Sequence, residues 1–284
     1  MASFNIPNEY AAVAPIIVTS PTARCGTTLI QRLLSSGSNG LVYGENLAGH
    51  MNELTALCVR HLRFVDELGD VADKIFDQVL SGDLDDWRPG LMPPLEVSLK
   101  ALSETYYQTP LTVARHAESI GRPIWGVKYP AYSRDMIKAM LQLMPNCRFI
   151  YVFRNLFDVL KSMKARKFVK TDQDVIDCCV KWATNMKDLV ELASDERILF
   201  IKYEGLIAQH DDHVQLLQLF TGIENLSPAA FDVKVNTFRG DEENGHSPSQ
   251  YIEPEELTAS DREAIFREAG PVMEHLYGDM MKAA

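Results

Sequence analysis

The chain has 284 residues, of which 46% are hydrophobic and 24% are charged, a composition typical of soluble globular proteins. It carries 28 Lys and Arg against 39 Asp and Glu, a net charge of −11, which argues against nucleic-acid binding through general phosphate attraction. The sequence contains neither an apolar run of about 18 residues nor a signal-peptide pattern, so we expect a cytoplasmic protein without membrane contact.

The first predicted elements are a strand, a tight turn and a helix. Residues 16–18 form a short β-branched apolar run that predicts a buried strand, and residues 20–22 break it with a Ser-Pro-Thr turn. Apolar residues then return with helical spacing from Leu29 onward. This order brings the N–H groups of a first helical turn to the end of a strand, where they favour an anion.

The loop between this strand and helix has the residue types of a phosphate site. Gly26 allows close backbone approach, Thr27 and Thr28 offer hydroxyls, and Arg24 adds a positive charge. The triphosphate-binding pattern G-x-x-x-x-G-K-[ST] is absent because no Lys follows Gly26. The loop therefore fits a mononucleotide phosphate better than a triphosphate with its metal. The alternative is a strand–helix turn with an incidental Arg and Gly.

Cysteine usage points to reduced thiols. The chain has five cysteines, an odd number without the spacing of a metal site. A position at a helix N-terminus could lower the pKa of Cys25. The alternative is that Cys25 is a small residue whose backbone N–H matters more than its sulfur. We expect no metal.

The middle of the chain is predicted to be mostly helical. A turn cluster at 35–40 precedes residues 41–43, which bring the chain back near the sheet. From about 47 to 121 the apolar spacing is helical, with an interruption of acids, Pro and Gly at 83–94. We therefore expect a helical cap at 47–121, inserted between strands of the sheet.

The rest of the chain alternates between strands and helices. Strands are predicted at 123–128, 147–153 and 198–201. Helices are predicted at about 133–144, 172–193, 213–220 and 260–277. A further helix is predicted to begin after Asn155, which is its expected N-cap. The polar stretch 237–251 is a long loop of the kind that is usually functional or disordered.

Strands separated by helices indicate an α/β fold with a mainly parallel sheet covered on both faces. Ligands of such sheets bind at the carboxyl ends of the strands. Arg24 with its loop, Glu45, Lys128 and Arg154 each follow a predicted strand or the segment at 41–43. We expect these four groups along one edge of the sheet.

Two of these segments resemble the motifs of sulfotransferases that use 3′-phosphoadenosine 5′-phosphosulfate (PAPS). Residues 24–29 resemble the 5′-phosphosulfate loop R/K-S-G-T-T, with Cys25 in place of Ser. Residues 154–158, followed by Ser162, resemble the 3′-phosphate motif R-N-P-x-D-x-x-x-S, with Leu156 in place of Pro. Two spaced motifs in the correct order are more specific than either alone.

The resemblance extends over nearly the whole chain. Arg166 matches a further phosphate-contacting Arg, Tyr203 with Glu204 resembles a Tyr-Glu pair near the nucleotide, and the final segment 257–277 also fits. It implies one sulfotransferase domain over 1–284, a P-loop-like three-layer sandwich with a mainly parallel sheet and a helical cap. It further implies PAPS as donor, 3′-phosphoadenosine 5′-phosphate (PAP) as product, and binding by Arg24, Cys25, Gly26, Thr27, Thr28, Arg154, Ser162, Arg166 and Tyr203.

The resemblance also suggests catalytic residues. Sulfuryl transfer needs cations at the leaving phosphate and a base for the acceptor; Arg24 and Lys128 are the candidate cations. Many relatives carry the base as a Glu in a short Gly-Glu segment after the first helix, which Glu45 matches. His50 is the second candidate and His246 a weaker third; we also consider both for acceptor binding. The structural alternatives are a surface lysine at Lys128 and an ion pair at Arg154.

The acceptor is predicted to be a small molecule that enters between the sheet edge and the helical cap. Its sulfated group is a hydroxyl or an amine. Acids at 241–243 would tolerate a cationic natural product, although a solvated loop tip is the stronger interpretation of them. Two rival functions remain, a nucleotide or small-molecule kinase with a degenerate phosphate loop and a non-catalytic nucleotide-binding protein. The pattern predicts no oligomeric state.

Overall fold

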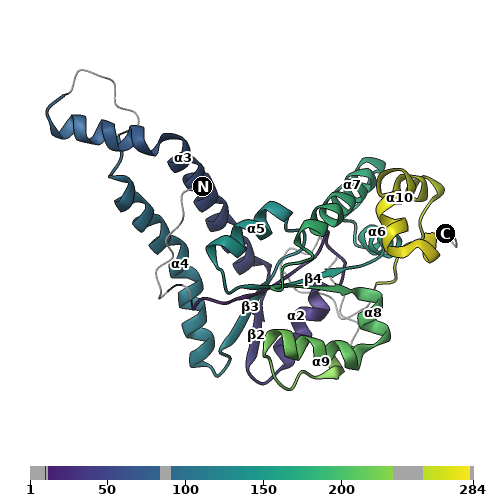
Figure 1. The fold of residues 1–284 in the computed structure, drawn as a ribbon. Coiled ribbons are helices and arrows are strands. Elements are labelled where there is room, and N and C mark those ends of the chain that lie inside the picture. Colours follow the sequence, from purple (N-terminus) through teal and green to yellow (C-terminus); the bar gives the residue numbers. More distant parts are fainter. Residues whose placement is uncertain (1–9, 11, 84–90, 233–251, 282–284) are drawn as a thin grey trace.

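The structure, a computed structural model, describes residues 10, 12–83, 91–232 and 252–281. Its centre is a sheet of parallel strands in the order β2-β3-β1-β4-β5 (Figure 1). The strands are β1 (Ile16–Thr19), β2 (Gly40–Tyr43), β3 (Ile124–Lys128), β4 (Arg148–Phe153) and β5 (Ile198–Lys202). Because every described strand runs the same way, all their carboxyl ends meet at one edge.

Helices cover both faces of this sheet. They are α2 (Thr27–Ser36), α3 (Glu45–Leu80), α4 (Leu95–Ser119), α5 (Arg134–Leu143), α6 (Leu156–Ala165), α7 (Asp172–Asp188), α8 (Tyr203–Ala208), α9 (His210–Thr221) and α10 (Ala259–Met281). Two short 3₁₀ turns span Leu189–Leu192 and Pro228–Ala230.

Alternation along the strands produces two hydrophobic cores. In β4, Phe149 and Tyr151 face the core shared with α3 to α7 and α10, whereas Ile150 and Val152 face the core shared with α2, α8 and α9. Both side-chain sets are fully buried, as expected for a parallel sheet covered on both faces. The predicted fold class, a three-layer α/β sandwich with a parallel central sheet, is confirmed.

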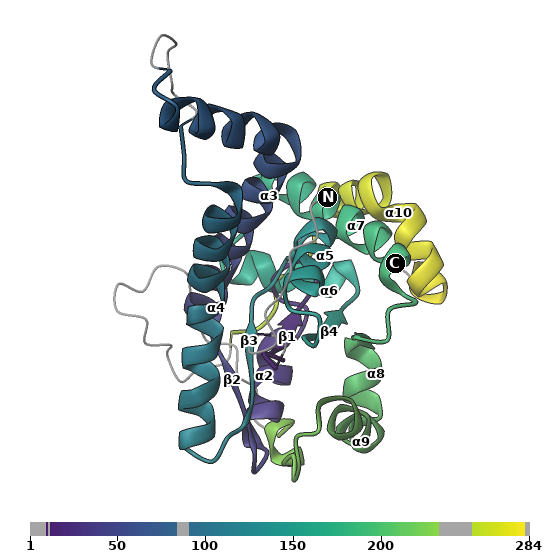
Figure 2. The same ribbon diagram turned by 60° about the vertical axis from the view of Figure 1, so that its left-hand side comes forward.

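The segment between β2 and β3 runs through α3 and α4, which lie side by side and project as an arm from the body (Figures 1 and 2). α3 alone has 36 residues. Thr55 and Tyr106 hydrogen-bond across the two helices at 3.3 Å, and the Leu95 N–H donates to Asp73 Oδ1 at 2.9 Å. Since Glu45 is the first residue of α3, the base of this arm lies at the carboxyl edge of the sheet.

Three sequence expectations need correction. Residues 41–43 do not merely return near the sheet, because Leu41 pairs in register with Trp125 and makes β2 a further strand. The helix expected at 172–193 ends at Asp188 and continues as a 3₁₀ turn. A short helix, α8, precedes the one expected at 213–220. The expected loop at 237–251 lies outside the described residues.

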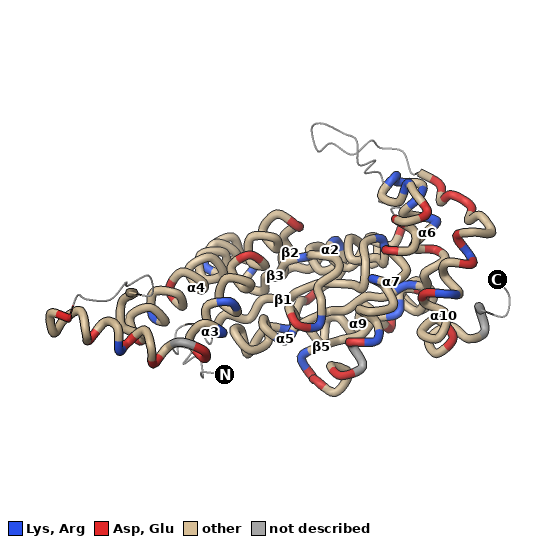
Figure 3. The backbone as a smooth tube through the Cα atoms, turned by 90° about the horizontal axis from the view of Figure 1, so that it is seen from above, with Lys and Arg blue, Asp and Glu red and all other residues tan. Residues whose placement is uncertain are grey.

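Charge is distributed over the whole molecule. Figure 3 shows Lys and Arg interspersed with Asp and Glu along the helices. In the described part of the chain, no helix is both long and apolar enough to cross a membrane. The basic groups at the carboxyl edge of the sheet are therefore a local feature of a chain whose net charge is −11.

Candidate active site

The loop after β1 is held by two neighbouring segments. Asn185 of α7 donates its amide N–H to the Pro21 carbonyl at 2.7 Å, and the Ala131 N–H donates to the Ser20 carbonyl at 2.8 Å. Arg24 and Gly26 both have positive φ, 71° and 105°. This conformation is free for glycine but strained for a residue such as Arg24, and such strained residues occur often at ligand sites.

Only glycine fits at position 26. A Cβ there would lie 2.4 Å from Cδ2 of Tyr203, and φ would remain unfavourable for any L side chain. The N–H groups of Leu29 and Ile30 donate to the Gly26 carbonyl at 3.0 and 3.2 Å. Because these are the first bonds of α2, the N–H groups of Thr27 and Thr28 lie outside the helix's own ladder and suit an anion.

The two predicted motifs meet in space. Arg24 Nε donates to Ser162 Oγ at 3.1 Å, although 138 residues separate them in the chain. Ser162 is buried on α6. The Arg24 guanidinium also lies 6.0 Å from the ring centroid of Phe168. The loop after β1 and the helix after β4 thus form one continuous site.

Arg154 follows β4 and stacks on Tyr203, with its guanidinium carbon 4.6 Å from the ring centroid. Its terminal nitrogen lies 3.4 Å from Asp158 Oδ2, so the ion pair considered from the sequence exists. However, Arg154 Nε is buried and has no hydrogen-bond partner in the described part of the chain. An orphaned guanidinium donor at a strand end is a group that an anionic ligand would satisfy.

Asn155 is the N-cap of α6, as predicted. Its Oδ1 accepts from the Asp158 N–H at 2.9 Å. The indole N–H of Trp182 donates to the Arg154 carbonyl at 3.2 Å. The backbone that carries Arg154 is therefore fixed from α6 and from α7.

Glu45 and Lys128 are in direct contact. Lys128 Nζ donates to Glu45 Oε1, and Lys128 pairs in register with Val18, just before the loop. The Lys128 side chain is only 10% exposed, whereas that of Glu45 is 51% exposed. Lys128 is thus not a surface lysine, and Glu45 is the member of the pair that solvent or a ligand can reach.

The remaining predicted residues are less well placed. His50 is exposed on α3, and His246 lies outside the described residues. Arg166 is 1% exposed and its terminal nitrogen lies 3.4 Å from the Ile252 carbonyl. This contact with the segment before α10 gives no support to its predicted phosphate role.

Cys25 differs from one sequence expectation. Its thiol is fully buried, and burial raises its pKa to about 11, against smaller opposing effects from hydrogen bonding to Thr22. The lowering of the pKa by the helix N-terminus, one of the two interpretations considered from the sequence, does not occur, because desolvation of the thiolate outweighs it. The other interpretation, a small residue that acts through its backbone N–H, stays a prediction.

The comparison with known families identifies the family of this chain. Residues 15–228 match the family model described as the sulfotransferase family. The chain belongs to the sulfotransferase family. This confirms the resemblance to PAPS-dependent sulfotransferases and the expectation of an enzyme, whereas nothing in the match favours the kinase alternative.

Solved structures also resemble this sulfotransferase. The sulfotransferase domain of the Synechococcus PCC 7002 olefin synthase has 14% identity and a TM-score of 0.47, covering 89% of this chain and 94% of its own. The sulfotransferase domain of the curacin biosynthetic pathway has 17% identity and a TM-score of 0.47, and the match covers 89% of this chain and 97% of that domain. STF1 of Mycobacterium tuberculosis has 16% identity and a TM-score of 0.44, and the match covers 95% of this chain and 80% of STF1. No curated protein sequence matches significantly.

Sequence reasoning missed two residues that support the site of this sulfotransferase. Asn185 and Trp182 of α7 fix the loop after β1 and the Arg154 backbone. Each stands alone in a helical segment of mixed polarity, so no local signal connects it with the loop or with Arg154. The sequence indicates Glu204 only as part of a Tyr-Glu pair, and the structure adds that it accepts hydrogen bonds from Asn155 and Tyr277.

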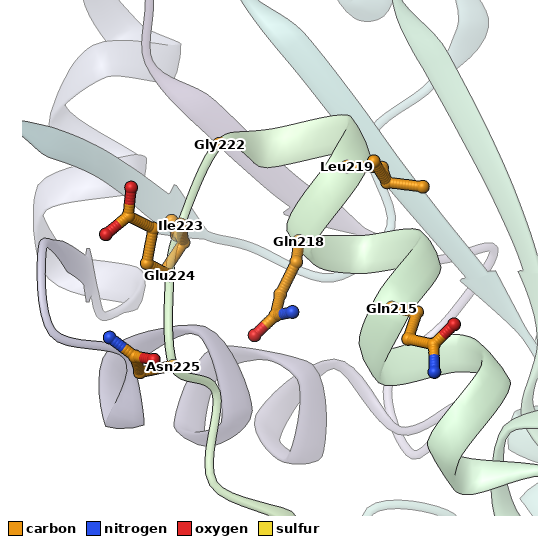
Figure 4. Close-up of a pocket in the computed structure, with 7 residues that line it drawn as sticks. All are labelled: Gln215, Gln218, Leu219, Gly222, Ile223, Glu224 and Asn225. Carbon is orange, nitrogen blue, oxygen red and sulfur yellow. The ribbon is translucent and has the colours of Figure 1, made fainter.

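A separate hollow lies between α9 and the segment after it (Figure 4). It is near the amino ends of β2 and β3, since the Asn39 amide donates to the Gly222 carbonyl there at 3.2 Å. Gln218 Oε1 accepts from the Leu226 N–H at 3.0 Å and Asn225 Nδ2 donates to Ser38 Oγ at 3.1 Å. Because these polar groups already serve local structure, we assign no ligand to the hollow.

Proposed function

We propose that this sulfotransferase moves a sulfuryl group from PAPS to a hydroxyl or amine of a small-molecule acceptor. The observation that carries the proposal is the contact of Glu45 with Lys128 beside a phosphate loop whose Arg24 reaches Ser162. A base, two cations and an anion site therefore lie at neighbouring strand ends. This combination is what in-line transfer to an activated acceptor requires.

The residues fit a ligand with two separate anionic groups. The loop 24–28, with Cys25 contributing its backbone N–H, would hold the 5′-phosphosulfate, because the first N–H groups of α2 and Arg24 converge there. The buried Nε of Arg154 and the hydroxyl of Ser162 would hold the 3′-phosphate. Tyr203, which covers Gly26 and supports Arg154, would border the nucleotide. When bound, PAPS supplies the sulfuryl group and a phosphate leaving group.

Glu45 and Lys128 divide the chemistry between them. Glu45 would accept the acceptor's proton at a carboxylate oxygen while the acceptor oxygen or nitrogen forms its bond to sulfur. In that transfer the bond from sulfur to the 5′-phosphate oxygen would break, and its electron pair would stay on that oxygen. Lys128 and Arg24 would stabilise this developing negative charge in a partly buried site, where cations act most strongly.

The acceptor is proposed to approach Glu45 at the base of the α3–α4 arm. We infer a single catalytic domain in which α3 and α4 are the inserted helices and in which the acceptor enters near Glu45. A cationic acceptor is compatible with the exposed Glu45 carboxylate. No metal is needed in this scheme, and in the described residues no three His, Cys, Asp or Glu side chains are grouped as metal ligands.

Calorimetric titration with PAP, with ATP and Mg²⁺ as comparison, tests the donor. We expect metal-independent binding of PAP, and preference for ATP would overturn the proposal. Glu45→Gln tests the base: kcat should fall by about 10²- to 10⁴-fold, with nearly unchanged affinity for PAP. Equal loss of PAP affinity in Glu45→Gln and Arg154→Ala would contradict the separate roles.

A further inference from the structure

A chain of hydrogen bonds joins the C-terminal helix to the strand end that carries Arg154. Glu204 Oε1 accepts from both the backbone N–H and the side-chain amide of Asn155, each at 2.9 Å. Its second oxygen, Oε2, accepts from the Tyr277 hydroxyl at 3.2 Å. Glu204 thus uses both carboxylate oxygens, one toward the proposed 3′-phosphate site and one toward α10.

Tyr277 is built into this position. It is 3% exposed and interrupts α10 with φ −141° and ψ 31°. Lys202 Nζ lies 4.0 Å from the centroid of its ring and donates to the Leu276 carbonyl at 3.1 Å. Burial and the neighbouring Glu204 carboxylate raise the pKa of Tyr277 well above its usual value, so the phenol remains a proton donor.

Asn155 is the residue through which this series of hydrogen bonds reaches the candidate ligand site. It is 1% exposed, caps α6, and directly follows Arg154. Its Nδ2 also donates to Asp158 Oδ2 at 2.8 Å, and Asp158 in turn pairs with Arg154. A shift of Asn155 would therefore move the Arg154 backbone and the first turn of α6 together.

We propose that Glu204 is a positioning residue for the 3′-phosphate site and that Tyr277 fixes Glu204 from the C-terminal helix. This inference rests on the proposed function. Through the hydrogen bond from Tyr277 to Glu204, α10 sets part of the affinity for the nucleotide donor, although α10 lies outside both predicted phosphate motifs. Neither residue need touch the ligand.

A purely electrostatic role for Glu204 and a positioning role predict opposite changes in phosphate affinity when Glu204 is removed. Glu204 is an anion close to a site for an anion, so removal of its charge would tighten phosphate binding if charge were its only effect. Removal of a positioning group weakens binding because Arg154 is no longer held in place. Glu204→Ala therefore distinguishes the two roles by the direction of the change.

Tyr277→Phe tests the connection without altering charge. We expect the Kd for PAP to rise about threefold to tenfold, because only part of the free energy of the lost hydrogen bond to Glu204 is transmitted to the ligand site. The Kd for adenosine 5′-phosphate, which lacks the 3′-phosphate, should stay unchanged. The KM for PAPS should rise with little change in kcat.

Tyr106→Phe is the matched control. Tyr106 is 2% exposed and makes its hydroxyl contact with Thr55 at 3.3 Å in the α3–α4 arm. It should lower thermal stability comparably to Tyr277→Phe and leave PAP affinity unchanged. A purely structural role for Tyr277 predicts that both variants behave alike.

Four results would overturn the inference. They are unchanged PAP affinity in Tyr277→Phe, equal weakening of PAP and adenosine 5′-phosphate, tighter PAP binding in Glu204→Ala, and equal loss of PAP affinity in Tyr106→Phe. If Glu204→Ala does not fold, Tyr277→Phe decides alone. If the unaltered protein binds no PAP, the proposed function fails, and the inference falls with it.

Discussion

The two halves of the candidate site are built differently. At the ends of β4 and β5, the strand end that carries Arg154 is fixed by hydrogen bonds involving Asn155, Trp182 and Glu204. At the ends of β2 and β3, the hydrogen bond from Lys128 to Glu45 is the one side-chain hydrogen bond that this pair makes within the described part of the chain, and Glu45 is half exposed. The first half is densely supported and the second is held mainly by one ion pair.

This difference matches the tasks proposed for the halves. A ligand site gains affinity when its groups are held before binding, because less freedom is lost on association. A general base must instead give up its hydrogen-bond partner, here Lys128, in order to accept the proton of the acceptor. Because the Glu45 side chain is half exposed, solvent or the acceptor can take the place of Lys128 as its partner.

Lys128→Met should produce the largest effect and would separate catalysis from binding. We expect kcat to fall by about 10²- to 10³-fold, as for loss of one group that stabilises developing charge. PAP affinity should change little. Steady-state kinetics and calorimetry check this, with Lys138→Met as control because Lys138 pairs with Glu191 on the surface. A large loss of PAP affinity would show that the halves are not separate.

Gly26→Ala should damage binding in both halves, because Gly26 belongs to the loop and packs against Tyr203. The strain of about 1–3 kcal/mol for a left-handed non-glycine residue, with the contact at 2.4 Å, predicts a rise in the PAP Kd of roughly ten- to hundredfold. Gly121→Ala is the control, since Gly121 has φ 75° with open space around it. It should lower stability without affecting Kd.

Ser162→Ala tests the link between the halves. Arg24 Nε would lose its acceptor at 3.1 Å, and the PAP Kd should rise about threefold to tenfold. Isothermal titration calorimetry measures the change. Unchanged affinity would contradict both the proposed contact of Ser162 with the 3′-phosphate and its role in positioning Arg24.

Asp261→Asn examines how α10 is attached, with stability as readout. Asp261 is 3% exposed, and although burial alone would raise its pKa, hydrogen bonds from Lys164 and Thr258 lower the pKa below its usual value. Its stabilising contribution is therefore present above the unfolded pKa and is lost as pH falls through the folded one. We expect a loss of about 1.5–3 kcal/mol in unfolding free energy at pH 7. Denaturant unfolding should show that loss shrinking toward pH 3, and a pH-independent loss would contradict the assignment.

Cys25→Ser should have the smallest effect. Because burial raises the pKa of Cys25 to about 11, the residue is a neutral thiol at pH 7.5 and serves through its backbone. Activity should remain within about twofold, and iodoacetamide should not label Cys25 in the native protein. Rapid labelling detected by mass spectrometry would refute the burial argument.

Local sequence signals were sufficient where the relevant residues are contiguous. The phosphate loop follows from an apolar strand, a turn and a helical repeat within 14 residues, 16–29. The N-cap at Asn155 follows from a polar residue between a strand and an apolar helix. The sequence did not predict β2 as a strand. β2 has only four residues and lies at the edge of the sheet beyond β3, and a pattern this short does not distinguish a strand from a loop.

The sequence by itself determined the alternation of strands and helices and the loop after the first strand, because propensity and periodicity act over a few residues. The second motif was indicated by the resemblance to the sulfotransferase family. Only the tertiary structure decided that Glu45 meets Lys128, that Arg24 reaches Ser162 and that Glu204 joins Asn155 to Tyr277. It also decided that burial outweighs the helix N-terminus at Cys25. These outcomes depend on strand order and on the packing of distant helices, and both are set by contacts between residues far apart in the chain.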